Sequence, residues 1–447
     1  MSLLQNIIRE LQANVASLEK SLASEANGAS PHLFEARPYA SLDDDEASPP
    51  WDAFALIDKI RLDLKAVEAA VTPTSKLYLN TVFASNKAAA LSTAAVLGVT
   101  DAIIGLGGRA SLDDIAAKVG TNAQKLGRIL RLVAGEFIYR EVAPDVFANT
   151  RHSMGLRKAT KAYHFLKFSA YEGGAATAAL CANLTNPKTK DSYQPKDAPF
   201  SQAVSNGKAF DEYVMEPAQA EMLQNITEGV VPWLNRTTRS PLLLDYPWHE
   251  LGNSRVIDVG CGPADSGFDI LQKNPKLTWV LQDLPHMIDL VKTLVPPALA
   301  DRVKSGDISF QVQDYFEANT ARGDVWYLRG VIREYDDADA LRVLKNVVAA
   351  MRETKGSRLV LNEVLCSTPA IVDDNSVVDA PSKHLPYEQA SLYELANLIT
   401  WNTYALFGGK ERTYRDTVAL LEAAGLHVTK LYKFRTFTSN IECIVRE

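Results

Sequence analysis

The sequence predicts an α/β chain with a helical first half and a second half built on a parallel sheet. In the second half, short β-branched runs alternate with helical segments from "RVIDVG" onward. In the first half, "ASLDDIAAKVGTNAQKLGRILRLVAGEFIYREVAPDVFANT" has the order helix, short turn, helix and small hairpin, which is typical of a winged helix. We therefore expect a helical, winged-helix domain over residues 1–240 and a nucleotide-binding-type domain over residues 241–447.

The amino-acid composition limits the classes of molecule that the chain is expected to bind. The 447 residues are 47% hydrophobic and 23% charged, with a formal net charge of -7, so no overall field attracts nucleic acid or an acidic membrane. A small-molecule partner is expected. The four cysteines form no CxxC pair, the start "MSLLQNIIRELQ" lacks the apolar core of a secretion signal, and no apolar run is long enough to span a membrane. These features predict a reducing, cytoplasmic location.

The N-terminal segment is predicted to be an amphipathic helix that needs a covering surface. Apolar residues recur at helical spacing, and a partner subunit is one candidate to cover them: Leu4, Ile7, Ile8, Leu11, Val15, Leu18 and Leu22. From about Ala23 to Trp51 the composition turns to Ala, Ser, Pro and Asp. We expect a linker or surface arm there, with no core of its own.

The winged-helix pattern raises the question of DNA binding. Its second helix offers only three basic residues, Lys125, Arg128 and Arg131, within an acidic chain. Apolar Ile129, Leu130 and Leu132 on the same helix fit packing and dimerisation better. We therefore expect no nucleic-acid partner.

Six runs in the second half are strand candidates, and helices fit between most of them. Helices on both faces of a parallel sheet follow from this alternation. The candidates are "RVIDVG", "LTWVLQDL", "ISFQVQDYF", "DVWYLRGV", "SRLVLNEVL" and "IECIVRE".

Polar groups at three successive strand ends predict a nucleoside site. In "VIDVGCGPADSG", Gly260 and Gly262 allow a tight turn and close approach of a ligand to the backbone. This signal is weak alone. Asp283 ends the second strand about 20 residues on, where a carboxylate accepts both hydroxyls of a ribose, and Asp314 ends the third. The alternative is that each acid caps the following helix.

The second half resembles the plant and fungal O-methyltransferases that use S-adenosylmethionine. The motifs that carry this resemblance, in order, are "VIDVGCG", "LQDLP", "VQDYFE", "DVWYLRGVIREYDDADALRVLKN", "LVLNEVL" and "GGKERTYRDTVALLEAAGL". The resemblance extends from about Ser75 to the end. It implies a Rossmann-like class I methyltransferase domain, an N-terminal winged-helix dimerisation domain and a homodimer.

The resemblance also assigns cofactor residues and implies no metal. Asp258, Gly260 and Gly262 would shape the cofactor loop. Asp283, with Leu284 beside it, would hold the ribose. Asp314 and Tyr315 would flank the adenine, and Arg329 would lie near the methionine end.

The sequence departs from the family at its proton acceptor. Where the family has His, Asp and Trp, this chain has Arg333, Glu334 and Tyr335. The pKa of a guanidinium is above about 12, so arginine is no base at neutral pH, and loss of general-base assistance costs roughly a hundred- to ten-thousand-fold in rate. Glu363 matches the acid that orients the histidine, and we expect it to form a salt bridge with Arg333 instead.

Three functions remain open. Fungal O-methyltransferase-like pericyclases, the group that includes the leporin pericyclase, carry Arg or Lys near this position and keep the cofactor whole. By resemblance, this chain would dehydrate a pyridone-type alcohol to a quinone methide and steer its Alder-ene or hetero-Diels-Alder cyclisation, with Arg333 as an electrostatic catalyst. The alternatives are an O-methyltransferase using a self-ionising phenol, Glu334 or His164 as the base, and a cofactor-binding regulatory protein.

The acceptor pocket is assigned by resemblance alone. Phe210, Tyr213, Met222, Asn225 and Thr227 occupy segments that line the family's acceptor site, although simple packing explains them equally. Thr400, Thr403 and Tyr404 stand where the family has an Asp and a Met pair, which suggests a rebuilt pocket. His164 lies near a second catalytic histidine of the leporin pericyclase, and a structural role stays open.

Overall fold

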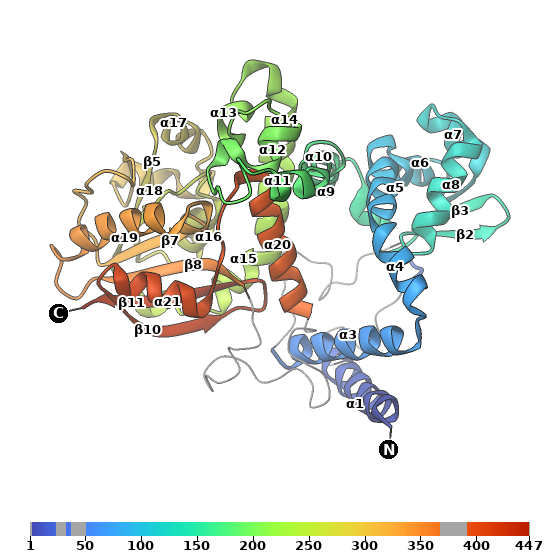
Figure 1. The fold of residues 1–447 in the computed structure, drawn as a ribbon, viewed down its shortest axis with the longest axis horizontal. Helices are drawn as coiled ribbons and strands as arrows, with labels where there is room; N and C mark the ends of the chain where they lie inside the picture. Colours follow the sequence, from blue (N-terminus) through green and yellow to red (C-terminus); the bar gives the residue numbers. More distant parts are fainter. Residues whose placement is uncertain (1, 24–32, 37–50, 367–390, 447) are drawn as a thin grey trace. The chain divides into compact units, whose positions relative to one another are not determined.

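The computed structural model describes residues 2–23, 33–36, 51–366 and 391–446 (Figure 1). Apart from residues 33–36, the predicted linker lies outside the described residues. The chain forms two compact units, Met1–Cys181 with Phe200–Arg236, and Ala182–Pro199 with Thr237–Glu447. The domain boundary expected at residue 240 stays a prediction.

The first unit is helical, and the predicted N-terminal helix is confirmed. Helix α1 packs on α3, which buries Ile7 and Leu22 and so covers part of the apolar stripe. The helices before the winged-helix region are α1 (Leu3–Ala23), α3 (Trp51–Val71), α4 (Thr74–Val82), α5 (Ala84–Leu97) and α6 (Val99–Gly105). Those after it are α9 (Lys161–Phe168), α10 (Gly174–Ala178), α12 (Pro199–Ala203), α13 (Phe210–Val214) and α14 (Ala220–Asn225), with π-turns η2 (Ser169–Gly173) and η5 (Ile226–Val230). Helix α11 (Leu180–Thr185) begins in the first unit and ends in the second.

The winged-helix arrangement is also confirmed. Strand β1 (Arg109–Ser111), helices α7 (Leu112–Val119) and α8 (Ala123–Ala134), and strands β2 (Tyr139–Ala143) and β3 (Val146–Asn149) form it, with sheet order β1-β3-β2. Side chains of Ser111 and Asn122 cap the two helices, as the turn chemistry requires. The Arg131 guanidinium forms ion pairs with Glu141 and Asp145 of the wing, which neutralises one of the three charges considered for DNA binding.

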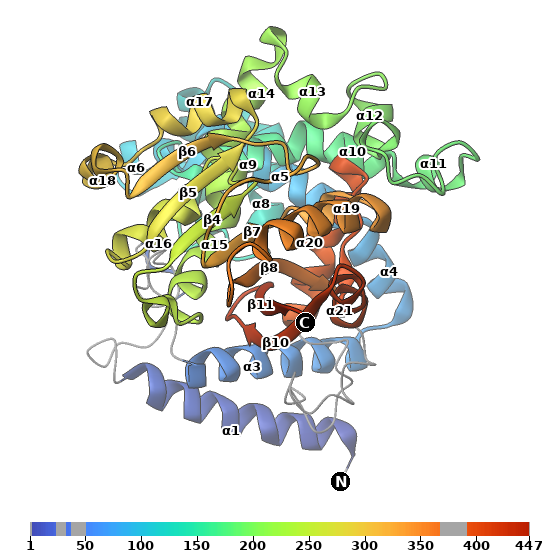
Figure 2. The ribbon, with the colours of Figure 1, turned by 90° about the vertical axis from the view of Figure 1, so that its left-hand side faces the viewer.

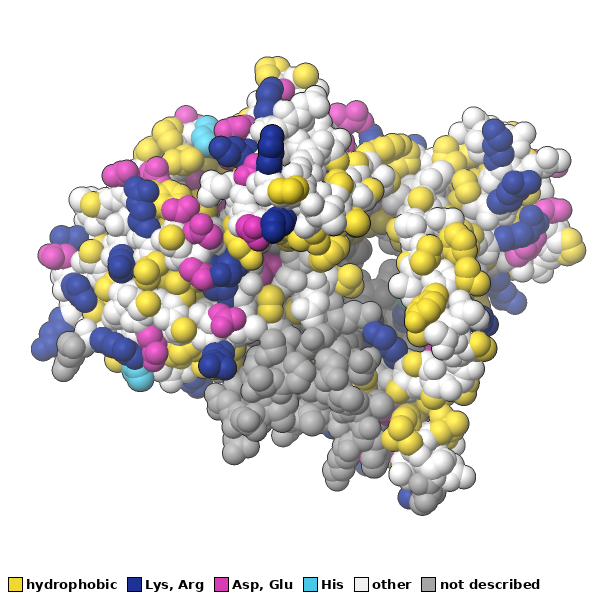
Figure 3. Space-filling model, viewed as in Figure 1, with side chains coloured by type: hydrophobic (Ala, Val, Ile, Leu, Met, Phe, Trp, Pro, Cys, Tyr) yellow, Lys and Arg dark blue, Asp and Glu magenta, His cyan; other side chains and the backbone are white. Residues whose placement is uncertain are grey.

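Helix α4 exposes its apolar side chains. None of its residues is buried, and hydrophobic side chains cover it in the space-filling view (Figure 3). The exposed large ones on α4 and at its end are Leu77, Tyr78, Leu79, Val82 and Phe83. Among the described residues no single helix meets the length and hydropathy of a membrane span, although the bent pair Thr74–Leu97 and Val99–Gly105 does so jointly.

The second unit contains an eight-stranded sheet with the order β10-β11-β8-β7-β4-β5-β6, and β9 pairs with β8. Its strands are β4 (Arg255–Val259), β5 (Thr278–Asp283), β6 (Ile308–Val312), β7 (Val325–Arg329), β8 (Arg358–Cys366), β9 (Arg412–Thr413), β10 (Leu426–Lys433) and β11 (Thr438–Val445). All six predicted strands form. The expectation of a purely parallel sheet was wrong, because β10 and β11 form a hairpin and β11 runs antiparallel to β8. Strand β10, "LHVTKLYK", is half polar, so its pattern did not identify it.

Helices cover both faces of this sheet, as predicted (Figures 1 and 2). Alternate strand residues feed two separate cores, since successive side chains of a strand point to opposite faces. Ile257, Trp326 and Leu361 pack with α19 and α21, whereas Val256 and Tyr327 pack with α15 and α16. The helices are α15 (Val231–Leu244), α16 (Asp265–Lys273), α17 (Pro285–Thr293), α18 (Ala300–Ser305), α19 (Asp337–Met351), α20 (Ser391–Phe407) and α21 (Tyr414–Ala423). The carboxyl ends of β4, β5, β6 and β7 therefore meet at one edge.

Candidate active site

The glycine loop after β4 forms a tight cradle. Gly260 and Gly262 have φ angles of 70° and 54°, a region that favours glycine. A Cβ on Gly260 would lie 3.2 Å from Tyr315 Cε1 and 3.1 Å from Val331 Cγ2. The N–H groups of Gly260 and Cys261 both donate to the carbonyl oxygen of Gln282. The loop is thus fixed against β5 with its backbone open for a ligand.

Asp283 ties the end of β5 to this cradle. One carboxylate oxygen accepts the N–H of Gly262 at 2.9 Å and the other accepts that of Leu284 at 2.8 Å. Burial raises the pKa of Asp283, and the two backbone donors partly oppose that rise. Each oxygen retains acceptor capacity for a further donor, so the side chain can still receive a hydroxyl.

Asp258 supports the loop from behind. Its side chain is buried and accepts a hydrogen bond from Trp279 Nε1 at 3.0 Å. Burial raises the pKa of Asp258 to about 7. The structure therefore places this residue as a buried support beside Gly267, in keeping with its expected part in shaping the loop.

Asp314 and Tyr315 follow β6 at the same edge. Asp314 is exposed and accepts the N–H of Phe316, and the Tyr315 hydroxyl lies 2.6 Å from that of Tyr335. Arg329 ends β7, and its Nη2 donates to the Thr238 hydroxyl at 3.1 Å. All the predicted cofactor residues thus lie on the strand ends or on the loops that follow them.

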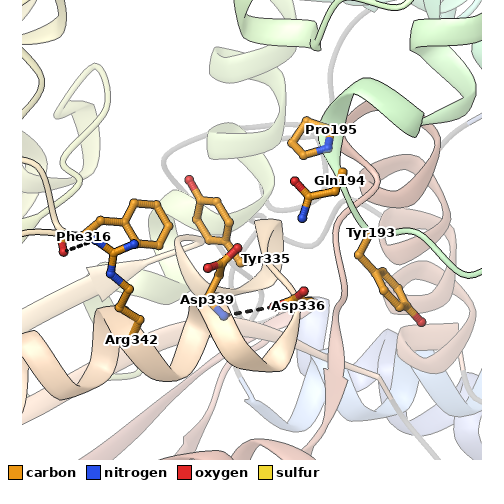
Figure 4. A pocket seen from close by; sticks show the side chains of 8 residues that line it. All are labelled: Tyr193, Gln194, Pro195, Phe316, Tyr335, Asp336, Asp339 and Arg342. Carbon is orange, nitrogen blue, oxygen red and sulfur yellow. Dashed lines mark hydrogen bonds between the residues drawn. The ribbon is translucent and has the colours of Figure 1, made fainter.

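A cavity of about 220 Å³ adjoins the tyrosine pair (Figure 4). In the view of Figure 4 the Tyr335 ring lies between Phe316 and Gln194, and the Arg342 guanidinium lies 5.1 Å from the Phe316 ring centre. The cavity is lined by Tyr193, Gln194, Pro195, Phe316, Tyr335, Asp336, Asp339 and Arg342. Tyr335, whose hydroxyl lies 2.6 Å from that of Tyr315, thus links this cavity to the strand edge.

Arg333 lies on a short turn (η8, Ile332–Glu334) that is held from three sides. Arg412 donates to the carbonyl oxygens of Ile332 and Tyr335 at 2.9 Å each, and a Glu363 oxygen accepts the N–H of Ile332 at 3.2 Å. Arg412 is itself almost fully buried. The backbone that carries Arg333 is therefore fixed.

The ion pair of Arg333 forms with Glu411, so the expected salt bridge with Glu363 was wrong. Nη1 of Arg333 lies 3.1 Å from Oε1 of Glu411, whose side chain is 1% exposed, while that of Arg333 is 21% exposed. The Thr403 hydroxyl donates to the same Glu411 oxygen at 2.9 Å. Burial raises the pKa of Glu411, and Arg333 and Thr403 oppose that rise.

Gly409 makes this pairing possible. A Cβ there would lie 2.5 Å from the carbonyl oxygen of Arg333 and 3.0 Å from Thr403 Cγ2. Only glycine allows the chain to pass this close before presenting Glu411. The motif "GGKERT" is recognisable in the sequence, but no role for Gly409, Glu411 or Arg412 follows from it, because these residues lie about 80 positions from Arg333 in the chain.

Glu363 is a second buried acid beside the same guanidinium. Burial raises its pKa to about 8; the charge of Arg333 lowers it and that of Glu411 raises it. Within the described residues its Oε2 has no hydrogen-bond partner. The Arg333 guanidinium thus faces two carboxyl groups. Glu411 forms the ion pair, and Glu363 is the group that more readily stays protonated.

The remaining predicted residues are already engaged within their own units. Phe210 and Met222 are buried in the first unit, and Phe210 and Tyr213 pack on Phe200, so the packing explanation holds for them. Hydroxyls of Thr227 and Thr400 donate to carbonyls of their own helices. The Tyr404 hydroxyl donates to Asn183 Oδ1. His164 lies in the first unit between Asn225 and Glu228.

Comparison with known proteins agrees with this geometry. Residues 242–427 match the O-methyltransferase domain and residues 79–156 match the O-methyltransferase dimerisation domain. The 3-O-methyltransferase 2 of Phanerochaete chrysosporium is 29% identical over 362 residues, covering 79% of this chain and 78% of that protein. The chain belongs to the O-methyltransferase family, whose cofactor is S-adenosylmethionine.

Two solved structures show the same fold. CalO1, a methyltransferase in calicheamicin biosynthesis with S-adenosylhomocysteine bound, has a TM-score of 0.62 and 21% identity, covering 83% of this chain and 98% of that one. A structure described as a pericyclic reaction enzyme has a TM-score of 0.69 and 18% identity, covering 98% and 100%. At these identities the likeness establishes the fold.

The first prediction concerns Gly409. Gly409→Ala should displace η8 from Glu411 and lower the unfolding free energy by about 1–3 kcal/mol, the usual cost of overpacking. The measurement is urea denaturation. Gly155→Ala is the control, because a Cβ there meets nothing within 4 Å. Equal stability of both variants would contradict the close approach.

The second prediction concerns the proton on Glu363. Its pKa in the folded protein is above the ordinary 4.5, so the folded state binds more protons than the unfolded state between pH 4.5 and about 8. Stability from this group is fully present below 4.5 and is lost as the pH rises through about 8. The unfolding free energy, measured by urea denaturation at pH values from 5 to 9, should therefore fall less steeply with rising pH for Glu363→Gln than for the wild type. Parallel curves would refute a raised pKa, and the exposed Glu422→Gln serves as control.

Proposed function

We propose that this chain is a pericyclase that binds S-adenosylmethionine and does not transfer its methyl group. The proposal rests on Arg333: an arginine on a fixed turn stands where the resemblance to the family places the base. Its guanidinium is partly exposed and is held at Nη1 by the buried Glu411. A group that stays protonated and fixed suits charge stabilisation, whereas proton abstraction requires a base.

The reaction class follows from what a fixed positive charge can do. Loss of water from a pyridone-type alcohol gives a quinone methide, and its Alder-ene or hetero-Diels-Alder closure is eased by positive charge near the carbonyl oxygen. At about 4 Å and an effective dielectric near 20, one such contact contributes on the order of 4 kcal/mol, before desolvation and the opposing charge of Glu411 are subtracted. Since about 1.4 kcal/mol corresponds to a tenfold change in rate, a fraction of this suffices.

The strand-edge residues fit the cofactor of the family. Gly260 packs closely against Tyr315 and Val331, and the space beside Gly262 is open. Asp283 can accept ribose hydroxyls while it fixes Gly262. Asp314, Tyr315 and Arg329 line the same edge, and Leu284, 41% exposed, lies beside Asp283. When bound, S-adenosylmethionine supplies either a transferable methyl group or, if it stays whole, a second positive charge.

O-methyl transfer to a phenolic secondary metabolite is the second candidate. It is favoured by the curated relatives, which include the sterigmatocystin 8-O-methyltransferase of Aspergillus parasiticus, 30% identical over 283 residues. The difficulty for this candidate is to find a general base that removes the proton of the acceptor hydroxyl. Arg333 stays protonated, Glu411 is paired, and the raised pKa of Glu363 keeps a proton on it at neutral pH. This candidate therefore needs a self-ionising acceptor or another base, such as Glu334.

A homodimer is part of the proposal. Residues 79–156 match a dimerisation domain, and α4 leaves a set of large apolar side chains exposed just before and within that range. A second copy of the chain would remove this surface from water.

The cofactor assignment predicts a loss of binding in Asp283→Asn. An amide cannot accept from both Gly262 and Leu284 and also receive the ribose, so the dissociation constant for S-adenosylmethionine should rise at least about tenfold, a loss of about 1.4 kcal/mol. Isothermal titration calorimetry measures it. Asp289→Asn, on the neighbouring helix α17, is the control and should bind like the wild type. Unchanged binding in Asp283→Asn would refute the assignment.

The function is tested with S-adenosylmethionine and a panel of pyridone alcohols and phenols. The expected result is a product that is lighter by one water or isomeric with its precursor, formed without stoichiometric S-adenosylhomocysteine. Arg333→Gln should slow it about 10- to 1,000-fold while cofactor affinity stays within twofold, and Arg333→Lys should retain more activity than Arg333→Gln. Product heavier by one methylene with matching S-adenosylhomocysteine would overturn the proposal in favour of methyl transfer.

A further inference from the structure

Among the described residues, the Arg333 guanidinium is bound at one of its three nitrogens. Nη1 donates to Oε1 of Glu411 at 3.1 Å, whereas Nε is buried and has no hydrogen-bond partner in that part of the chain. The neighbour beside Nε is Gly330, where an added Cβ would lie 3.6 Å away, so no side chain covers Nε from that position. Nε and Nη2 of a guanidinium form a fork of two N–H donors that matches a pair of oxygen atoms. The described residues leave this fork, the Nε–Nη2 edge, without a partner.

Two other arginines of the same unit are bound at this edge by the protein itself. Arg239 donates from Nε and Nη2 to the two carboxylate oxygens of Asp269, at 2.6 and 2.9 Å. Arg435 donates from Nε and Nη2 to Oδ1 of Asp245, at 3.1 and 2.7 Å. These pairs make the two-point contact that best offsets the loss of hydration of both charges. Arg333 makes a one-point contact at its other end, which points to a different use of its fork.

Glu411 is confined to Nη1 by its own surroundings. Its side chain is 1% exposed, and the Thr403 hydroxyl donates to the same oxygen that accepts from Arg333. A Cβ on Gly409 would lie 2.5 Å from the carbonyl oxygen of Arg333, so the segment that carries Glu411 is in direct backbone contact with η8. Glu363, the other acid near this guanidinium, uses one oxygen for a backbone N–H of η8. Neither acid therefore closes the Nε–Nη2 edge.

We propose that the Nε–Nη2 edge of Arg333 binds two neighbouring oxygen atoms of the substrate, the ring oxygen and the departing hydroxyl. This inference rests on the proposed function and specifies its substrate class. The substrate is a ring that carries a hydroxyl on the carbon next to the one bearing a CH(OH) group. The two oxygens of such a compound lie within hydrogen-bonding distance of each other, so one fork can donate to both.

Two-point binding lets the proton move within the substrate. The ring hydroxyl gives its proton to the departing hydroxyl as the C–O bond breaks, and the bonding pair leaves with that oxygen as water. The O–H pair of the ring hydroxyl becomes the second bond of the new carbonyl, and the ring double bond shifts to form the exocyclic C=C bond. The alcohol thus gives a quinone methide and water without a proton acceptor from the protein. Arg333 stays protonated throughout and stabilises the charge that develops on the ring oxygen.

The test compares the binding of two isomeric probes to the full-length protein with S-adenosylmethionine present. In 2-hydroxybenzyl alcohol the two oxygens are neighbours, whereas in 4-hydroxybenzyl alcohol they lie at opposite ends of the ring. Titration followed by ligand-observed NMR gives both dissociation constants. Because each hydrogen bond from a charged donor contributes to affinity, we expect the wild type to bind the 2-isomer about tenfold more tightly. Equal affinities, or no binding of either probe, would overturn the proposal.

Arg333→Lys separates the fork from the charge. Lysine keeps a positive charge beside Glu411 but has no planar fork, so the preference for the 2-isomer should fall to about twofold or less. Arg446→Lys is the control and should keep the full preference, because Arg446 is an exposed arginine that also meets its acid, Glu422, through one nitrogen. A tenfold preference that persists in Arg333→Lys would contradict binding at this edge. Should Arg333→Lys not fold, the same ratio is measured in Arg333→Gln.

Product mass judges the proposed function separately. If the 2-isomer is preferred through Arg333 and no pyridone alcohol is dehydrated, the proposed function fails while the oxygen-pair site stands. If dehydration occurs and the wild type shows no preference between the isomers, this inference fails alone.

Discussion

The candidate active site depends on one fixed guanidinium. Arg333 is held at its backbone by Arg412 and Glu363 and at its side chain by Glu411, and these three partners come from β8 and from the segment around β9. A buried charge is tolerated only with partners, so removing any of them changes the position or the charge of the others. The resemblance to the family places a histidine at this position. Here the two acids Glu363 and Glu411 face a group that never gives up its proton.

That substitution changes the proton balance of the cluster. Two buried carboxyl groups facing one guanidinium cannot both be ionised without excess negative charge in a region of low dielectric. Glu411, with Arg333 and Thr403 as partners, is the one that is satisfied as a carboxylate, and Glu363 keeps a proton to about pH 8. The site therefore presents positive charge with no adjacent free base, which suits stabilisation of developing negative charge on a carbonyl oxygen.

The cofactor edge is organised by β5. The Gln282 carbonyl receives two N–H groups of the glycine loop, and its buried side-chain amide exchanges hydrogen bonds with Asn319, on the loop that carries Asp314 and Tyr315. One residue thus links the loops after β4 and β6, while the next residue, Asp283, fixes Gly262. Because these bonds are buried and reciprocal, the edge is preorganised before any ligand arrives.

The sequence by itself determined the elements and the strand-end residues. Short β-branched runs alternating with helical segments identified six strands, and the order of Gly260, Asp283 and Asp314 predicted the cofactor edge, since parallel strands bring their carboxyl ends together. Strand β10 was missed because an edge strand is half polar. Tertiary structure alone decided that Glu411 and not Glu363 pairs with Arg333, because Gly409 allows a backbone contact between segments far apart in the chain. It also decided that Asn225 and Glu228 reach His164, because the π-turn η5 packs on helix α9.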